Sequence, residues 1–238
     1  MKEEEALSSG KEKIILCWSG GKDSAMALYE ILNSPAYTVV ALLTTLTDTY
    51  DRISMHGVRR SLLEKQVDAI GIPLHKIFIS KQSSNTEYES KMEAACLYFK
   101  NQGVNTVAFG DIFLEDLREY REKNLAKLGM KGLFPIWKRD TTELIRSFIQ
   151  RGFKAVLTCI DPKSLDSSFV GRSIDEGLIH DLPSRVDPCG ENGEFHSFVY
   201  DGPIFHEEVK FSLGDKVLRD SFWFCDLVEV ETTFTRIS

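Results

Sequence analysis

The sequence KIILCWSGGKDSAMALYEIL, residues 13–32, decides the fold. It begins with a continuous apolar run over residues 14–18, which is typical of a strand buried on both faces of a parallel sheet. It ends with residues 25–32, most of which are strong helix formers. Residues 19–24 between them read Ser-Gly-Gly-Lys-Asp-Ser. The stretch therefore predicts a strand, a tight loop and a helix in immediate succession.

This loop has the chemistry of a pyrophosphate cradle. Its two glycines permit a tight turn and let backbone N–H groups approach an anion without a Cβ in the way. The N-terminus of the following helix adds unpaired N–H donors and partial positive charge. Lys22 supplies a cation, and Asp23 is a candidate ligand for Mg²⁺. The candidate nucleotide-binding residues here are Ser19, Gly20, Gly21, Lys22, Asp23 and Ser24.

The loop differs from a Walker A loop, which has Ser or Thr directly after its lysine where this chain has Asp23. It resembles instead the loop of the PP-loop, or N-type, ATP pyrophosphatases. Enzymes of that superfamily cleave ATP between its α and β phosphates. The alternative is a plain Gly-Ser turn between a strand and a helix. Six matching positions in the required strand–loop–helix context favour the functional interpretation.

The bulk composition places the chain among soluble globular proteins. At 238 residues it can bury a full α/β core and add a small second domain. A formal charge of −7 disfavours nucleic acid as a partner. The five scattered cysteines contain no Cys-x-x-Cys pair, which favours a reduced compartment and no structural zinc. No apolar run has the length of a membrane span and the N-terminus lacks a signal-peptide core, so we expect a cytoplasmic protein without membrane contact.

Five apolar segments separated by helical segments predict a doubly wound, mainly parallel five-stranded sheet with right-handed crossovers. The segments are residues 14–18, 37–45, 73–80, 104–109 and 153–160. From residue 161 onward the pattern changes to Gly, Pro and alternating aromatic residues, followed by a β-rich tail. We therefore expect a PP-loop ATP-binding domain over residues 1–160. A smaller C-terminal α+β domain, over residues 161–238, is expected to bind the substrate.

Polar residues at the carboxyl ends of the strands are further candidates, because open parallel sheets bind ligands at that edge. Thr44 and Thr45 end the second segment, and strand filling is an equal alternative for each. Gly110 and Asp111 follow the fourth segment. Asp111 is a candidate for contact with Mg²⁺ or ribose, although Asp is also a common helix N-cap. His56, in a long loop before the next helix, is a candidate for contact with nucleotide or substrate, or an ordinary helix-start histidine.

Three places in the chain together resemble the diphthine–ammonia ligase family, a branch of the PP-loop superfamily, in its short form. They are residues 19–24, Gly110-Asp111 with Phe-Pro-Ile-Trp at 134–137, and residues 190–203. The last is the most specific, and it runs from Gly-Glu-Asn-Gly-Glu-Phe to Asp-Gly-Pro. The family usually has Gly-Glu-Gly-Gly-Glu-(Tyr/Phe)-Glu there, so Asn192 and His196 are departures. The resemblance covers nearly the whole chain and implies an adenine nucleotide α-hydrolase-like fold.

The resemblance also implies an ATP-dependent amide ligase. In its reaction a substrate carboxylate attacks the α-phosphorus of ATP, and pyrophosphate departs into the loop. Ammonia then attacks the acyl-adenylate, giving the amide and AMP. Lys22, Mg²⁺ and the loop N–H groups are expected to stabilise the leaving pyrophosphate.

The expected partners are ATP, ammonium and a carboxylate-bearing acceptor. The family's namesake substrate, a modified histidine on elongation factor 2, exists in archaea and eukaryotes only. The acceptor is therefore diphthine if the source is archaeal or eukaryotic, and an unknown small molecule or protein otherwise. A homo-oligomer is compatible with the sequence.

The C-terminal signature supplies the remaining catalytic candidates beside Lys22 and Asp23. Glu191 and Glu194 are expected to face the crevice, where they would bind a cation, hold ammonium or accept a proton. The alternative is a solvated turn, since Gly and Asn surround them. His196 is expected to act as a general base near neutral pH, with a surface histidine as the equal alternative.

Two other functions stay open at this point. A PP-loop tRNA-modifying enzyme would show a basic RNA-binding surface and usually paired catalytic cysteines or an appended basic domain, and Cys189 is the one thiol that calls for inspection. A buried, inert side chain is the more common state of a lone cysteine. A nucleotide-binding protein without catalysis is the second alternative, and the complete loop weighs against it.

Overall fold

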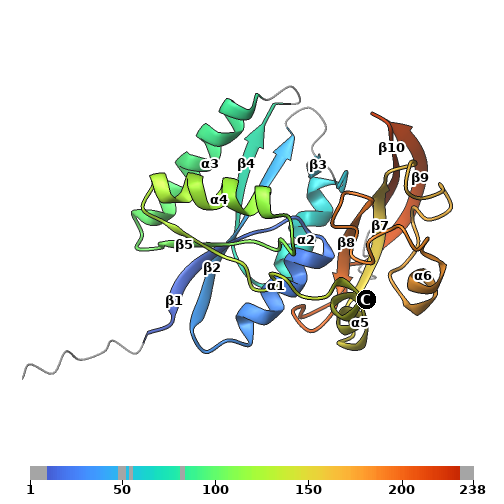
Figure 1. Ribbon diagram of the computed structural model, residues 1–238, viewed down its shortest axis with the longest axis horizontal. Coiled ribbons are helices and arrows are strands. Elements are labelled where there is room, and N and C mark those ends of the chain that lie inside the picture. The colour runs from blue at the N-terminus through green and yellow to red at the C-terminus, as the bar shows by residue number, and fades with distance from the viewer. Residues whose placement is uncertain (1–9, 48–51, 54–55, 81–83, 231–238) are drawn as a thin grey trace, which may run out of the picture.

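The computed structural model describes residues 10–47, 52–53, 56–80 and 84–230, and all statements below concern these residues. They form two sheets, one of six strands and one of four (Figure 1). The mixed α/β class, with a mainly parallel sheet and a smaller second unit, is therefore confirmed. No helix in the described part of the chain is long and apolar enough to cross a membrane.

The first sheet is built around its central strand, which leads into the glycine loop. Its order is β3-β2-β1-β5-β6, with β4 also paired to β2. All pairs are parallel except β2 with β3. Ile14, Ile15 and Leu16 of the central strand are fully buried, as expected of a strand covered on both faces. The strands are β1 (Glu12–Cys17), β2 (Tyr37–Thr47), β3 (Arg52–Ile53), β4 (Leu74–Ile79), β5 (Thr106–Ala108) and β6 (Lys131–Leu133).

Helices cover both faces of this sheet. Alternate residues of β1 point to opposite faces: Ile14 and Leu16 pack in the apolar cluster that contains the first two helices, whereas Ile15 packs in the cluster that contains the next two. The helices are α1 (Lys22–Leu32), α2 (Arg60–Ile70), α3 (Asn85–Lys100) and α4 (Glu115–Lys127).

The second sheet is antiparallel throughout, in the order β8-β7-β10-β9. It shares one apolar cluster with α1 and α2, which lie between the two sheets, with β8 next to α1 and β10 next to α2 (Figure 1). Its elements and the two helices that accompany it are α5 (Thr141–Gln150), β7 (Lys154–Ile160), α6 (Glu176–Asp181), β8 (Phe195–Asp201), β9 (Phe211–Arg219) and β10 (Phe222–Glu229).

One strand assignment made from the sequence is wrong. Residues 153–160 were expected to form the fifth strand of the parallel sheet, but β7 pairs antiparallel with β8 and β10 in the second sheet. Six of its seven residues are buried, and a buried strand has the same apolar sequence pattern in a parallel and in an antiparallel sheet. The fifth parallel strand is β6, whose three residues are too few to give an apolar pattern. The division at residue 160 stays a prediction, and the membership of β7 favours a division between β6 and α5.

Candidate functional site

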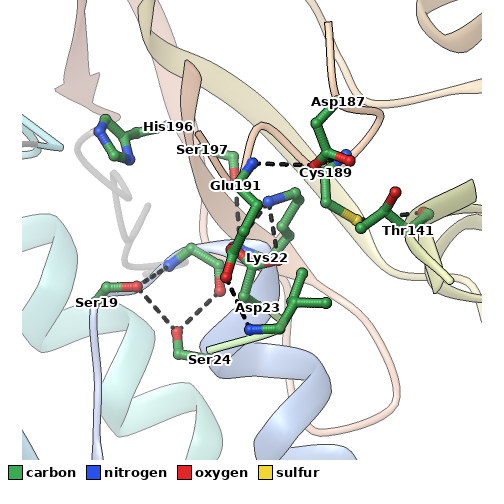
Figure 2. A network of polar contacts seen from close by, with 12 residues as sticks. Ser19, Lys22, Asp23, Ser24, Thr141, Asp187, Cys189, Glu191, His196 and Ser197 are labelled. Atoms are coloured by element: carbon green, nitrogen blue, oxygen red, sulfur yellow. Dashed lines mark hydrogen bonds and ion pairs between the residues drawn. The ribbon is translucent and has the colours of Figure 1, made fainter. Parts of the chain in front are cut away.

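The glycine loop is closed by its own serines (Figure 2). The Gly21 N–H donates to Ser19 Oγ at 3.2 Å, and Ser24 Oγ donates to the Gly21 carbonyl at 2.9 Å. Gly20 has a φ of +77°, which favours glycine. A Cβ on Gly21 would lie 2.9 Å from His56 Cε1 and 3.1 Å from the Ser197 carbonyl oxygen. Both glycines are thus required, one by its backbone conformation and the other by close approach of its neighbours.

Strand β8 of the second sheet lies directly behind this loop. Ser197 Oγ accepts a hydrogen bond from the Lys22 N–H at 3.2 Å, across 175 residues of chain. The N-cap of α1 is Gly21, which has no side chain to do this, so Ser197 caps the helix from the other sheet. The Val199 N–H donates to the Gly20 carbonyl at 2.9 Å. Ser197 was not found from the sequence, because nothing local relates it to the loop.

A small polar cleft opens between the loop and the turn that precedes β8. Its volume of about 120 Å³ is below the range of about 300–1,000 Å³ typical of small-molecule pockets. It therefore suits a phosphate-sized group more than a whole nucleotide. The residues around it come from both sheets: Ser19, Lys22, Asp23, His56, Gly190, Glu191, Gly193, Phe195, His196 and Ser197.

Lys22 and Asp23 form a close ion pair in this cleft. Lys22 Nζ lies 2.8 and 2.7 Å from the two Asp23 carboxylate oxygens. It also lies 5.3 Å from the centre of the Phe195 ring. Burial acts to lower the pKa of Lys22, but the anionic groups around it, Asp23 first, outweigh this and raise that pKa. The cleft therefore holds a buried, permanently charged ammonium group.

Glu191 approaches the same cleft from the other side. Its Oε1 accepts hydrogen bonds from the Ile112 N–H at 2.8 Å and the Phe113 N–H at 3.4 Å, just past the carboxyl end of β5. Burial raises its pKa to about 7, and the nearby Asp23 carboxylate adds to the shift. The structure thus brings Glu191 together with Lys22 and Asp23, with a carboxyl group that titrates near neutral pH.

Glu194, three residues further on, is placed differently from our expectation. It is not among the residues that line the cleft, and its side chain is buried in the turn. Its two oxygens accept from the Asp187 N–H at 3.1 Å, the Asn192 N–H at 3.0 Å and the Asn192 side-chain amide at 3.0 Å. A carboxylate with these three donors holds the turn in shape. The expectation that Glu194 faces the crevice is therefore wrong.

The two histidines of the cleft lie next to each other, with ring centres 4.8 Å apart. His56 Nδ1 is 3.0 Å from the Ser197 carbonyl oxygen. Burial lowers the pKa of His56 to about 4 and that of His196 to about 3. Both rings are therefore neutral at pH 7. A ring with so low a pKa is a weak base, so the expectation that His196 acts as a general base near neutral pH is wrong.

The predicted residues after β5 support the loop but do not line the cleft. A Cβ on Gly110 would lie 2.8 Å from the Asp23 carbonyl carbon, so Gly110 lets this segment pack on the loop backbone. Asp111 accepts from Arg121 Nε at 2.6 Å and from Arg121 Nη2 at 3.2 Å. Both its oxygens are thus held by a guanidinium. The structure does not support Asp111 as a Mg²⁺ ligand, and within the described residues no three acidic, histidine or cysteine groups are placed to share a metal.

Thr44 and Thr45 stand at the carboxyl half of β2 and do not line the cleft either. Thr44 is 3% exposed, and its Oγ1 has no hydrogen-bond partner among the described residues. It follows Leu43, whose carbonyl accepts from the Trp18 N–H at the entrance to the loop. Contact of these threonines with a nucleotide stays a prediction. Part of the long loop before His56 lies outside the described residues.

Cys189 is not a reactive thiol. It is 1% exposed, and its Sγ donates to the Thr141 carbonyl at the start of α5, at 3.3 Å. Burial raises its pKa well above the usual range, so the thiolate does not form at neutral pH. The other four cysteines are also unpaired.

Comparison with known families shows the family to which the chain belongs. The model of the diphthamide synthase N-terminal domain matches residues 12–132, and that of the diphthamide synthase C-terminal domain matches residues 140–232. The chain belongs to the diphthamide synthase family. The resemblance that its sequence motifs indicated is thereby confirmed.

Curated relatives of this diphthamide synthase family member share one name. The chain is 26% identical to the diphthine–ammonia ligase of Schizosaccharomyces pombe, covering 90% of this chain and 38% of that protein. It is 26% identical to the Danio rerio enzyme of the same name, covering 84% of this chain and 86% of the relative. It is 24% identical to the Homo sapiens enzyme of that name, covering 85% of this chain and 84% of the relative. The chain thus spans well under half of the S. pombe protein.

Among solved structures, a phosphoadenylyl-sulfate reductase from Candida auris, in complex with phosphate, matches 61% of this chain and 75% of its own. The sequence identity is 18% and the TM-score is 0.37. A likeness this distant carries no argument about the site.

Proposed function

We propose that the protein is an ATP-dependent ligase that adenylates a substrate carboxylate, releasing pyrophosphate, and then amidates it with ammonia, releasing AMP. The observation that carries the proposal is that the Ser19–Ser24 loop and Glu191 share one cleft. The loop has the chemistry to hold a polyanion, and Glu191 has the chemistry to move a proton. Membership of the diphthamide synthase family and the shared name of the relatives support it.

The loop half of the cleft fits a leaving pyrophosphate. The Gly21 and Lys22 N–H groups donate to Ser19 Oγ and Ser197 Oγ, and the N–H groups that follow in the first turn of α1 have no acceptor within the helix, so an anion is a favourable partner for them. The buried ammonium of Lys22 lies beside them and stabilises negative charge strongly because the surroundings exclude water. Ser197 and Asp23 hold the start of α1 and the Lys22 side chain in place.

Mg²⁺ fits this site with Asp23 as its protein ligand. The ion is commonly held in nucleotide sites by one or two carboxylates together with phosphate oxygens. Both oxygens of Asp23 contact Lys22 Nζ, just as both oxygens of Asp111 contact Arg121, but Asp23 lines the cleft with its side chain 30% exposed, whereas Asp111 does not line it. Mg²⁺ would therefore share Asp23 with Lys22. A bound Mg²⁺ would neutralise phosphate charge.

The turn half of the cleft fits the nitrogen substrate. Ammonium must lose a proton before its nitrogen can attack an acyl-adenylate, and a base with a pKa near the working pH does this best. Glu191, with a pKa of about 7, meets that condition, whereas His196, with a pKa of about 3, does not. In its charged form Glu191 also attracts ammonium. We assign the proton transfer to Glu191.

The name that the relatives share, diphthine–ammonia ligase, indicates the acceptor carboxylate. Diphthine is the acceptor if the protein comes from an archaeon or a eukaryote, and another carboxylate-bearing molecule takes its place otherwise. The chemistry of activation and amidation is the same in both cases. The acidic net charge and the inert Cys189 both weigh against a tRNA-modifying enzyme that transfers sulfur.

Product analysis tests the proposal. The protein is incubated with ATP, Mg²⁺, ammonium and a panel of carboxylates that includes diphthine-bearing elongation factor 2, and nucleotides are separated by chromatography. We expect AMP and pyrophosphate in equal amounts, formed only when an acceptor is present. Formation of ADP and phosphate would overturn the ligase assignment. Tight, salt-sensitive binding of tRNA would move the tRNA-modifying enzyme to first place.

A further inference from the structure

Gln66 is a fully buried polar side chain in α2 that the mechanism above does not use. It lies at the seam where α2, the glycine loop and β8 meet. Its Oε1 accepts from the Trp18 indole N–H at 2.9 Å. Its Nε2 donates to the Gly20 carbonyl at 2.9 Å and to the Val199 carbonyl at 2.5 Å. One amide thus joins the entrance of the loop, the loop itself and the second sheet.

The orientation of this amide is fixed by its partners. The Trp18 indole N–H can only donate, so the Gln66 oxygen must face it. The two donors of Nε2 then face two carbonyl oxygens, which can only accept. Every hydrogen-bonding group of the side chain is therefore used, although it is 0% exposed. Methionine or leucine would fill the same space without satisfying any of these partners.

The carbonyl of Gly20 is the group that this arrangement controls. It accepts from Gln66 Nε2 and from the Val199 N–H, both at 2.9 Å, so both of its lone pairs are engaged. Gln66 and Val199 are fully buried, and neither lines the cleft. The carbonyl is thus held toward the buried seam. The left-handed conformation of Gly20, with φ of +77°, is part of the same turn.

A carbonyl oxygen that faced the cleft would repel an anion, whereas backbone N–H groups attract one. We propose that Gln66 is a positioning residue of the phosphate loop: it holds the Gly20 carbonyl away from the cleft, so that the loop presents N–H groups to pyrophosphate. This inference rests on the proposed function, because pyrophosphate is the ligand that the function assigns to the loop. It also makes the second sheet part of the phosphate site, since Val199 supplies the other hydrogen bond.

The test is binding of inorganic pyrophosphate to the full chain, measured by isothermal titration calorimetry. Gln66→Met keeps the volume of the side chain and removes both donors and the acceptor. We expect its Kd to be about tenfold weaker, because the Gly20 carbonyl loses one of its two donors. Val67→Ala is the matched control: Val67 is the buried neighbour in α2, and its truncation destabilises the same helix without touching the loop. Its Kd is expected to stay within about twofold of the wild type.

Gln66→Glu sharpens the test and replaces Gln66→Met if that variant does not fold. Its neutral carboxyl form keeps the acceptor for Trp18 and one donor, whereas its charged form has no donor. Burial beside two carbonyl oxygens raises the pKa of the introduced carboxyl above its ordinary value near 4.5. Relative to the wild type at the same pH, pyrophosphate binding is therefore expected to be stronger at pH 5.5 than at pH 8. Wild-type affinity in folded Gln66→Met, or an equal loss in Val67→Ala, would overturn the inference; if Gln66→Met does not fold, wild-type affinity of Gln66→Glu at both pH values would do so.

Failure of the proposed function is separable from failure of this inference. If the wild-type protein binds no pyrophosphate, the proposed function fails. Hydrogen exchange at the Val199 amide then still tests Gln66, because that amide donates to the carbonyl that Gln66 holds. Faster exchange in Gln66→Met than in Val67→Ala supports the positioning role, and equal exchange contradicts it.

Discussion

The cation on the loop side of the cleft and the titratable groups on its turn side respond to burial differently. On the loop side, Lys22 stays charged although it is buried, because the anionic groups around it, Asp23 first at 2.7 Å, outweigh burial, while burial raises the pKa of Asp23 itself. On the turn side, burial favours the neutral forms: it raises the pKa of Glu191 to about 7 and lowers that of His196 to about 3. A fixed charge is suited to holding a polyanion, and a group near its pKa is suited to moving a proton. The difference assigns binding to one sheet and proton transfer to the other.

The largest effect is expected from Lys22→Ala, which removes the fixed charge. The leaving pyrophosphate loses its nearest cation, and Asp23 is left without its partner. We expect kcat/KM for ATP to fall on the order of 10³-fold, the upper end of what one stabilising donor contributes. Steady-state assays of AMP formation measure this. Lys76→Ala, on the outside of β4 and away from the cleft, is the control, and activity of Lys22→Ala near that of the control would remove the loop from the mechanism.

Glu191→Gln is expected to have the next largest effect. The side chain keeps its shape but cannot accept a proton, so amide formation is expected to slow on the order of 10²-fold. Exchange of labelled pyrophosphate into ATP, which reports adenylation alone, is expected to change much less. In the wild type the amidation rate rises as pH increases toward 7, because Glu191 becomes charged. A variant that retains this rise would show that another group is the base; Glu207→Gln, at an exposed position, is the control.

The same substitution changes how stability depends on pH. The folded-state pKa of Glu191 is about 7, above its ordinary value of 4.5, so the folded protein binds this proton more tightly than the unfolded chain. The stabilisation that this proton gives the folded protein is therefore fully present below pH 4.5 and is lost as pH rises to 7. We expect Glu191→Gln to be more stable than the wild type at pH 8, by about 2 kcal/mol in urea unfolding. If the difference in unfolding free energy between Glu191→Gln and the wild type is the same at pH 5 and at pH 8, this pKa shift is contradicted.

Glu194→Gln separates the two glutamates of one turn. Glu194 accepts three hydrogen bonds within the turn, and the substituted amide places N–H groups against N–H donors. We expect a loss of about 1–3 kcal/mol in unfolding free energy. Amidation at a temperature where the variant is folded is expected to fall only a few fold, well below the effect of Glu191→Gln. An unchanged stability with a large loss of rate would restore Glu194 as a catalytic group.

The smallest effect is expected from Cys189→Ala. The thiol is buried and bonded to the Thr141 carbonyl, so its removal leaves a small cavity at the start of α5. Activity is expected to stay within about twofold of the wild type, with a loss of about 1 kcal/mol in stability. Loss of activity, or labelling of Cys189 by a thiol reagent in the native protein at pH 7, would revive the sulfur-transfer alternative.

The loop side of the site was predictable because its information is local. Strand, glycine loop and helix follow one another within residues 13–32, and each is specified by its own residues. The turn side was predictable only in part. Glu191 and Glu194 look alike in sequence, and what separates them is which backbone N–H groups reach them, from Ile112 in one case and from Asp187 in the other. That depends on how the two sheets pack.

Residues that join the sheets were not predictable for the same reason. Ser197 and Gln66 lie 175 and 46 residues from the loop atoms they contact. Strand β7 was assigned to the wrong sheet because a fully buried antiparallel strand has the same apolar run as a parallel one. Asp111 at the end of β5 had the correct place for a nucleotide contact, but the approach of Arg121 from α4 uses both its oxygens.

A crystal structure with bound ATP tests the central claim most directly, namely that the two sheets form one site divided between phosphate binding and proton transfer. The account predicts the β and γ phosphates against the backbone N–H groups at the start of α1 and beside Lys22 Nζ, with the α-phosphorus turned toward Glu191. An empty Ser19–Ser24 loop, or phosphates bound away from the cleft shared with Glu191, would contradict it.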